Sequence, residues 1–323
     1  MPAEGRAPAA PRQKVLLDVD PGHDDALAIL VAGALPGLEL LAVTTVAGNQ
    51  TIEKTTRNAR AVLALGGIDL PVAAGAARPL VRAPITAAEI HGESGLDGAD
   101  LPAPRASLDP RPAAHLIAEC VRRFPGEVTL IPTGPLTNVA LSLRLAPDIA
   151  PKIRRISLMG GSAGAGNTTA SAEFNILADP EAADIVFSSG VPITMCGLDV
   201  THQALADAAV LGRLRALDTP VSRAAVGWLR FFGETYRQVE GLPSPPVHDV
   251  CALMAVAHPE LFESRRLAVV VERLGTHTAG RTVCDLRPRA QGQGSVDVAF
   301  ALQREAFWEV VLTALGAYPR EVA

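Results

Sequence analysis

The sequence predicts a single doubly wound α/β domain, with a mostly parallel (mixed) sheet and helices on both of its faces. Apolar, β-branched runs alternate with helical patterns from the start of the chain, and this alternation favours parallel strands joined by helices. The 323 residues are 48% hydrophobic, which is enough for one large core. No internal repeat or clear linker divides them. We therefore expect one domain at residues 14–323, preceded by a disordered Pro/Ala-rich tail at residues 1–13.

The first half of the chain shows the alternation most clearly. The apolar run at residues 14–19 leads through the turn Pro21-Gly22 into an alanine- and leucine-rich helix. A second apolar run at 38–47 is followed by a helix at 51–65. Residues 71–112 then break into short segments rich in Pro, Gly and Asp. Regular elements resume with a helix at 112–124, a strand at 128–132, a helix entered from Thr137-Asn138 and a strand at 155–159.

The second half continues with the same two patterns. A long amphipathic helix at 221–239 carries Trp228, Phe231, Phe232 and Tyr236, and aromatic residues at helical spacing are more often core or interface than a binding wall. The other predicted helices are 181–189, 205–217, 250–257 and 306–315, and the predicted strands are 192–198, 267–271, 282–286 and 296–301.

Composition narrows the class of protein. The net charge is −5, with acidic and basic residues interspersed, so no basic patch indicates a nucleic-acid partner. The four cysteines are dispersed, lack zinc spacing and are expected to be buried reduced thiols, which fits a cytoplasmic location. No apolar run reaches the roughly 18 residues of a spanning helix, and the start of the chain lacks the apolar core of a secretory signal. We expect no membrane association.

Three carboxylates gather at the end of the first predicted strand. Asp20 follows the apolar run, and Asp24 and Asp25 begin the next helix, so all three should converge where ligands bind in open parallel sheets. Crowded carboxylates resist joint ionisation unless a cation or strong hydrogen bonds compensate. Ca²⁺ takes six to eight oxygen ligands at about 2.3 to 2.6 Å, so it is the simplest compensation. The alternative is that Asp24 and Asp25 complement the helix dipole while Asp20 accepts turn amides.

Other polar residues also follow predicted strands or lie in loops. Thr133 ends the strand at 128–132, and its carbonyl is a candidate oxygen ligand, although such carbonyls more often face solvent. Glu173 and Asn175 would face the same way on extended backbone, which suits a polyhydroxy ligand such as a sugar and equally suits a solvent face. His91 lies in a glycine-rich loop and, taken alone, is an exposed loop residue. The glycines at 160–167 do not match GxGxxG, so we interpret them as a site-lining loop.

The segment Asp18-Val19-Asp20-Pro21-Gly22-His23-Asp24-Asp25-Ala26 resembles the signature of the inosine-uridine preferring nucleoside hydrolases. Seven segments similar to the family's motifs occur in the family's order along almost the whole chain, and the chain is identified by this resemblance as a member. The other six are Val46-Ala47-Gly48-Asn49, His91-Gly92, Thr133-Gly134-Pro135-Leu136-Thr137-Asn138, Met159-Gly160-Gly161, Glu173-Phe174-Asn175 and His248-Asp249.

The resemblance implies the nucleoside hydrolase fold and Ca²⁺-dependent hydrolysis of the N-glycosidic bond of ribonucleosides to ribose and a free base, as in nucleoside salvage. It also implies a homodimer or homotetramer. Asp20, Asp25, Asp249 and the main-chain carbonyl of Thr133 would hold the Ca²⁺. The substrate would be bound by Asp24, His91, Met159, Asn167, Glu173, Asn175, Phe232 and Tyr236.

The same resemblance assigns catalytic roles. Asp20 is expected to be the general base toward water, His248 the general acid toward the leaving base, and Asn49 a further active-site residue that lines the ribose pocket. His91 would lie near the base or the 5′ end, and the glycines around it would permit loop closure. A tyrosine at Tyr236 resembles members that accept both purine and pyrimidine nucleosides, such as inosine and uridine. Restriction to pyrimidine nucleosides is the alternative.

Two other classes of protein remain open from the residues alone. Asp18-x-Asp20 after an apolar strand has the spacing of a haloacid-dehalogenase-like phosphatase, but the following residues do not continue that motif. Phosphate release with Mg²⁺ would favour this class. A silent nucleoside-binding protein would bind ribose or nucleoside without turnover, and the intact Asp20, Asn175 and His248 argue against it.

Overall fold

The computed structural model describes residues 12–320, except 106 and 291. Residues 1–11, which make up most of the predicted tail, lie outside the described residues, as do residues 321–323. The first strand, β1, spans Gln13–Val19 and so begins one residue before the predicted domain boundary.

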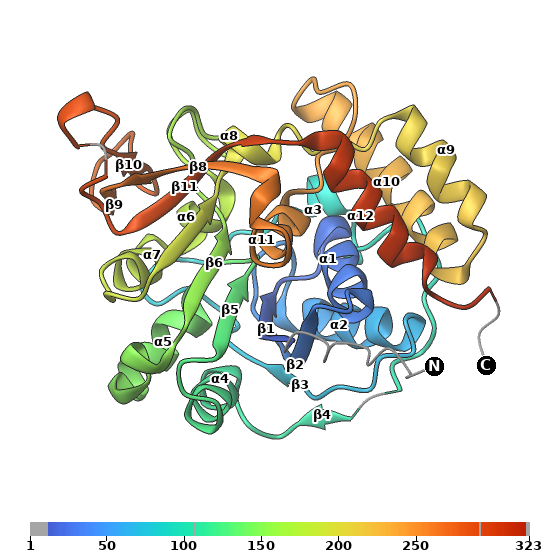
Figure 1. Cartoon of the computed structure of the whole chain (residues 1–323), viewed down its shortest axis with the longest axis horizontal. Coiled ribbons are helices and arrows are strands. Elements are labelled where there is room, and N and C mark those ends of the chain that lie inside the picture. The colour runs from blue at the N-terminus through green and yellow to red at the C-terminus, as the bar shows by residue number, and fades with distance from the viewer. Residues whose placement is uncertain (1–11, 106, 291, 321–323) are drawn as a thin grey trace, which may run out of the picture.

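A nine-stranded sheet of the described residues forms the centre of the molecule, in the order β4-β3-β2-β1-β5-β6-β7-β11-β8 (Figure 1). All neighbouring strands are parallel except β8, which pairs antiparallel with β11. This confirms the predicted mostly parallel, mixed sheet. Besides β1, the strands are β2 (Leu38–Thr45), β3 (Val72–Ala74), β4 (Leu108–Asp109), β5 (Val128–Pro132), β6 (Arg155–Met159), β7 (Ile193–Cys196), β8 (Phe262–Leu267) and β11 (Val296–Leu302).

Helices cover both faces of this sheet, as predicted (Figure 1). Successive residues of β1 face opposite sides of the sheet, so Val15 and Leu17 pack with one group of helices and Leu16 packs with a second group. A strand buried on both faces is therefore apolar throughout. The first group comprises α1 (His23–Ala34), α2 (Ile52–Leu65), α10 (Pro220–Val239), α11 (His248–Ala257) and α12 (Arg304–Gly316). The second comprises α4 (Ala113–Arg123), α5 (Thr137–Leu145) and α7 (Pro180–Phe187).

Some predicted boundaries differ from the structure. The strand predicted at 192–198 ends at Cys196, and the short helix α8 (Leu198–Thr201) follows. The strand predicted at 267–271 is two strands, because the chain leaves the sheet after Leu267 and forms a separate hairpin of β9 (Val269–Val271) and β10 (Thr282–Cys284). The remaining described helices are α3 (Ala88–His91), α6 (Phe174–Ala178), α9 (Ala208–Leu217), η1 (Pro147–Lys152), η2 (Pro259–Leu261) and η3 (Pro288–Ala290).

All four cysteines are free thiols. Cys196 and Cys251 are buried as predicted, but Cys120 and Cys284 are partly exposed, which the apolar surroundings in sequence did not indicate. In the part of the chain that the structure describes, no helix is both long and apolar enough to cross a membrane.

The strand order reverses between β1 and β5, which are neighbours in space although the chain visits β2, β3 and β4 between them. Crevices beyond the carboxyl ends of strands at such a reversal are the usual ligand sites of open α/β sheets. Asp20 follows β1 and Thr133 follows β5, so both reach this edge.

Candidate active site

A cavity of about 380 Å³ opens at this edge of the sheet. It is lined by all eight residues expected to bind substrate, together with four of the residues expected to hold a cation or to catalyse. Asp20 and Asp25 are fully buried behind this lining and contact it through Asn49 and Thr133. The lining residues in question are Asp24, His91, Met159, Asn167, Glu173, Asn175, Phe232 and Tyr236, with Asn49, Thr133, His248 and Asp249.

Three carboxylates meet at the floor of the cavity. Oxygen atoms of Asp24, Asp25 and Asp249 lie within 4.8 Å of one another, and all three side chains are buried. The Thr133 hydroxyl donates a hydrogen bond to Asp25 Oδ1 at 2.7 Å, which ties the end of β5 to the start of α1. Asp24 Oδ2 accepts a hydrogen bond from the backbone N–H of His248 at 3.1 Å, so the first turns of α1 and α11 face each other. Asp24, expected to bind sugar, thus lies in the same cluster as two expected cation ligands.

Asp20 lies beside this cluster, and two loops pack closely against its carboxylate. A Cβ at Gly48 or at Gly134 would overlap the Asp20 carboxylate, so both neighbouring loops approach it as bare backbone. Asp20 Oδ2 accepts the backbone N–H of Asn49 at 2.7 Å. Its other oxygen, Oδ1, is buried and has no hydrogen-bond partner among the described residues. A bound cation would satisfy this oxygen.

Burial raises the pKa of all four carboxylates. Together with the charge of Asp25, it raises the pKa of Asp24 to about 7, and it raises those of Asp20 and Asp249 well above their ordinary values. The pKa of Asp25 is also raised by burial, although hydrogen bonds from Thr133 and Gly22 oppose the shift. None of the described residues that line the cavity is a lysine or arginine. A bound cation would supply the positive charge that lets these groups ionise.

The donor set fits a hard divalent cation. Its clustered members are the carboxylates of Asp24, Asp25 and Asp249, whose oxygens are hard donors. Asp20 and the Thr133 carbonyl, also expected to hold the cation, follow β1 and β5 at the same edge of the sheet. The Thr133 carbonyl already accepts a hydrogen bond from Asn175 Nδ2 at 2.7 Å, which fixes the direction of this peptide. Sulfur and imidazole nitrogen, which suit softer metals, are not part of the cluster of Asp24, Asp25 and Asp249.

The wall beside the carboxylates is built by the start of α6. Glu173 is the N-cap of this helix: its carboxylate accepts the backbone N–H groups of Asn175 at 2.9 Å, Ile176 at 3.2 Å and Gly161 at 2.8 Å. The extended backbone on which Glu173 and Asn175 would face the same way ends at Glu173, because capping starts a helix at Phe174. Glu173 and Asn175 line the cavity nonetheless. Burial raises the pKa of Glu173 to about 7 despite its three N–H donors.

Aromatic side chains form another part of the lining. His248 is held at both ring nitrogens, with Nδ1 at 2.7 Å from the Thr201 hydroxyl and Nε2 at 2.7 Å from the Tyr236 hydroxyl. Tyr236 also packs edge-on against Phe232, with ring centroids 4.6 Å apart. Burial, together with the nearby His202, lowers the pKa of His248 to about 3. The ring is therefore neutral at pH 7 in the free protein.

His91 ends α3 and belongs to the same aromatic part of the cavity lining. Its ring stacks on Phe232 with centroids 5.1 Å apart and on His23 with centroids 5.2 Å apart. His23 and Thr201 are contacts that sequence reasoning missed. His23 lies inside the recognised signature, but nothing in its pattern shows that the ring faces His91, and Thr201 belongs to no motif.

Asp18, the residue behind the phosphatase alternative, does not reach the cavity. Its Oδ1 accepts hydrogen bonds from the Thr44 hydroxyl at 2.6 Å and from Asn138 Nδ2 at 2.8 Å, and the side chain is buried. Asp18 is not among the lining residues and its Oδ1 is held by two donors, which argues against a nucleophile aimed at a ligand in the cavity.

Comparisons with known proteins agree with this geometry. The family model described as inosine-uridine preferring nucleoside hydrolase matches residues 15–309. The pyrimidine-specific ribonucleoside hydrolase RihA of Shewanella oneidensis is 48% identical over 94% of this chain and 96% of its own, and RihA of Photobacterium profundum is 46% identical over 94% and 99%. The solved purine-preferring ribonucleoside hydrolase from Gardnerella vaginalis superimposes with a TM-score of 0.88 at 32% identity, over 94% of this chain and 98% of that one. The chain therefore belongs to the inosine-uridine preferring nucleoside hydrolase family and is a hydrolase of N-glycosyl compounds.

Proposed function

We propose that this enzyme hydrolyses pyrimidine ribonucleosides to ribose and free base with the aid of a bound Ca²⁺ ion. The observation that carries the proposal is the buried cluster of carboxylates beside an unpartnered Asp20 Oδ1, at the floor of a cavity whose wall presents Glu173 and Asn175. Such an oxygen-rich floor suits both a hard cation and the hydroxyls of a ribose.

Asp20, Asp25, Asp249 and the Thr133 carbonyl would hold the cation. Ca²⁺ would supply the charge that keeps these carboxylates ionised and that binds the ribose 2′ and 3′ hydroxyls. Asp24, Asn167, Glu173 and Asn175 would orient the sugar by hydrogen bonds, with Asn49 and Met159 beside it.

Cleavage gives the ribose oxocarbenium character, and the anionic floor stabilises that developing positive charge. Asp20 is our candidate for the general base. Its Oδ2 is held by the Asn49 N–H. The carboxylate would touch both the cation and the attacking water, whose proton it would accept.

The leaving base gathers negative charge as the bond breaks. His248 is our candidate to protonate it, directly or through the Tyr236 hydroxyl bound to its Nε2. The imidazole is neutral in the free cavity, so it would first take up a proton from solvent and then pass it to the leaving base. Negative charge developing on the base favours this charged form of the ring.

Pyrimidine preference is supported by relatives that are 45 to 48% identical and are named pyrimidine-specific. A broader range that includes inosine is the second candidate, and it is favoured by Tyr236 in the aromatic part of the cavity lining. We also propose a homodimer or homotetramer from the family resemblance, which light scattering of the purified protein tests.

The experiment is release of free base from uridine, cytidine, inosine and adenosine, each at matched concentrations with Ca²⁺ present. We expect kcat/KM for uridine or cytidine to exceed that for inosine by at least tenfold. Comparable values for uridine and inosine would establish the broader range. No release from any of the four would overturn the proposed reaction.

A further inference from the structure

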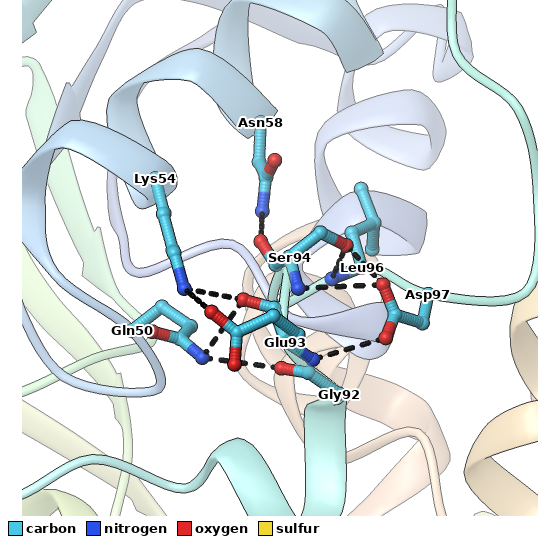
Figure 2. Close-up of polar contacts among 8 residues, drawn as sticks. All are labelled: Gln50, Lys54, Asn58, Gly92, Glu93, Ser94, Leu96 and Asp97. Atoms are coloured by element: carbon cyan, nitrogen blue, oxygen red, sulfur yellow. Dashed lines mark hydrogen bonds and ion pairs between the residues drawn. The ribbon is translucent and has the colours of Figure 1, made fainter.

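The segment after His91 is held by two side chains: Asn58 from α2 and Gln50 from the loop just before that helix. Gln50 Nε2 donates hydrogen bonds to the carbonyls of Gly92 at 3.1 Å and Glu93 at 3.2 Å, and Asn58 Nδ2 donates to the carbonyl of Ser94 at 2.9 Å (Figure 2). Gln50 and Asn58 are both buried. We call Gln50 and Asn58 the clamp, and residues 92–97 the clamped segment.

The clamped segment is itself closely bonded. The Asp97 carboxylate accepts the backbone N–H groups of Glu93 at 3.0 Å and Ser94 at 3.3 Å, and also the Ser94 hydroxyl (Figure 2). Gly92 has a φ of 81°, and a Cβ there would overlap the Asp97 carboxylate. Leu96 is buried in the core. The glycines therefore shape a fixed turn, and closure of residues 92–97 over a substrate would have to break these bonds.

Asn58 differs from Gln50 because it contacts two separate segments. The same Nδ2 that binds the Ser94 carbonyl also donates to the Pro21 carbonyl at 3.3 Å. Pro21 follows Asp20 and lies in the turn that leads to Asp24 and Asp25. One buried amide thus joins the turn that carries the carboxylates to the segment that follows His91.

His91 is seated on that same turn. A Cβ at Gly22 would overlap the His91 ring, and His91 Nδ1 lies 3.1 Å from His23 Nδ1. His23 Nε2 is in turn 2.8 Å from the Asp97 carbonyl, at the end of the clamped segment. The position of the ring therefore depends on the spacing between the turn and the segment, which Asn58 bridges.

We propose that Asn58 is a positioning residue that sets His91 at a fixed distance from the carboxylate floor. The proposal rests on the proposed nucleoside hydrolysis. A nucleoside spans the carboxylate floor and the wall that contains His91, so a small change in their spacing impairs its reaction. Free ribose lacks the base, so its binding depends far less on His91 than the reaction of a nucleoside does.

The test uses Asn58→Leu, which is similar in size and lacks the donor, beside Lys54→Gln as a matched control. Lys54 is on the same helix and bonds to Glu93, but that contact is exposed and contributes little. Uridine turnover, competitive inhibition by free ribose and thermal unfolding are measured for each protein in Ca²⁺. For Asn58→Leu we expect kcat/KM to fall 10- to 100-fold while the ribose inhibition constant stays within twofold of wild type. Lys54→Gln should match wild type in both.

Two results would overturn the inference: kcat/KM within twofold of wild type for Asn58→Leu, or parallel loss of uridine turnover and ribose binding, which would mean that Asn58 supports the whole site. If Asn58→Leu does not fold, Asn58→Ser carries the same test, because its short hydroxyl cannot reach both carbonyls. A wild-type protein that releases no base overturns the proposed function and this inference with it. An active wild type with an insensitive variant overturns the inference alone.

Discussion

His248 illustrates how a single side chain is prepared for its role by its neighbours. Its two ring nitrogens are engaged by Thr201 and Tyr236, so the ring cannot rotate without losing a hydrogen bond. The motif His248-Asp249 identified the residue in the sequence, but its partners come from α8 and α10 and no local pattern connects them.

We expect His248→Ala to impair substrates according to their leaving groups. General acid catalysis contributes about 10²- to 10⁴-fold, so kcat/KM for uridine should fall by that range. Hydrolysis of p-nitrophenyl riboside, whose leaving group needs no proton, should fall less than tenfold. Steady-state kinetics on both substrates check this, and equal losses would contradict the assignment of His248 as the acid.

Glu173 gives a prediction about stability and pH. Its pKa is about 7 in the folded protein against an ordinary value of 4.5, so ionisation opposes folding. The favourable contribution of the neutral form is fully present below pH 4.5 and is lost as pH rises through 7. In chelator, the free energy of unfolding of wild type should therefore fall by about 3 kcal/mol relative to Glu173→Gln between these limits.

Urea unfolding of both proteins at pH 4.5 and pH 8 measures this difference. The glutamine variant carries the same offset at both pH values from its altered N–H contacts, so only the change with pH matters. A wild-type-minus-variant difference that is the same at both pH values would show that Glu173 has an ordinary pKa.

At the scale of elements, the loop after β2 depends on a bare backbone at Gly48. A Cβ there would overlap the Asp20 carboxylate, so we expect Gly48→Ala to destabilise the fold by about 1 to 3 kcal/mol and to reduce turnover sharply. Gly212→Ala is the control, because this glycine lies inside α9 with open space around it and should stabilise by up to about 1 kcal/mol. Chemical denaturation of both variants measures this. A harmless Gly48→Ala would mean that the loop can move away from Asp20.

The regular elements were predictable because their signals are local. Apolar runs, helix-stopping glycines and capping residues placed β5 and β6 at their observed bounds, and α2 and α4 within about a residue. The start of α6 was missed because Glu173 caps its helix with a side chain that also belongs to the site. The pairing of β9 with β10 in a separate hairpin was missed. Tertiary packing decides whether a chain leaves a sheet, and the pattern of a single strand does not record that packing.

At the scale of the whole molecule, the site has a strongly one-sided charge. Five carboxylates line the cavity: Asp24, Glu89, Glu173, Glu240 and Asp249. None of the described lining residues is a lysine or arginine. Like charges brought together at a binding surface cost several kcal/mol. We therefore expect kcat/KM for uridine 5′-monophosphate to be at least about 100-fold below that for uridine. Base release from both substrates at equal ionic strength measures this, and comparable values would show that the 5′ end lies outside the field of these groups.

The topology explains how much of the site was predictable. Parallel strands placed Asp20 and Thr133 at one edge, and the resemblance named the residues that gather there, all of which lie in or directly behind the cavity. Contacts such as that of Asn58 with Pro21 and Ser94 depend on where α2 packs against the loop. No sequence pattern specifies that distance, so they emerged only from the structure.

In the proposed reaction the carboxylates of this site work only with Ca²⁺ bound. This dependence is measured by the release of uracil from uridine by protein stripped with chelator, before and after Ca²⁺ is returned, with Asp20→Asn assayed in parallel. We expect turnover to fall at least about 100-fold on stripping and to recover with Ca²⁺ in the wild type but not in the variant. Full turnover by the stripped wild-type protein, with chelator still present, would contradict the account.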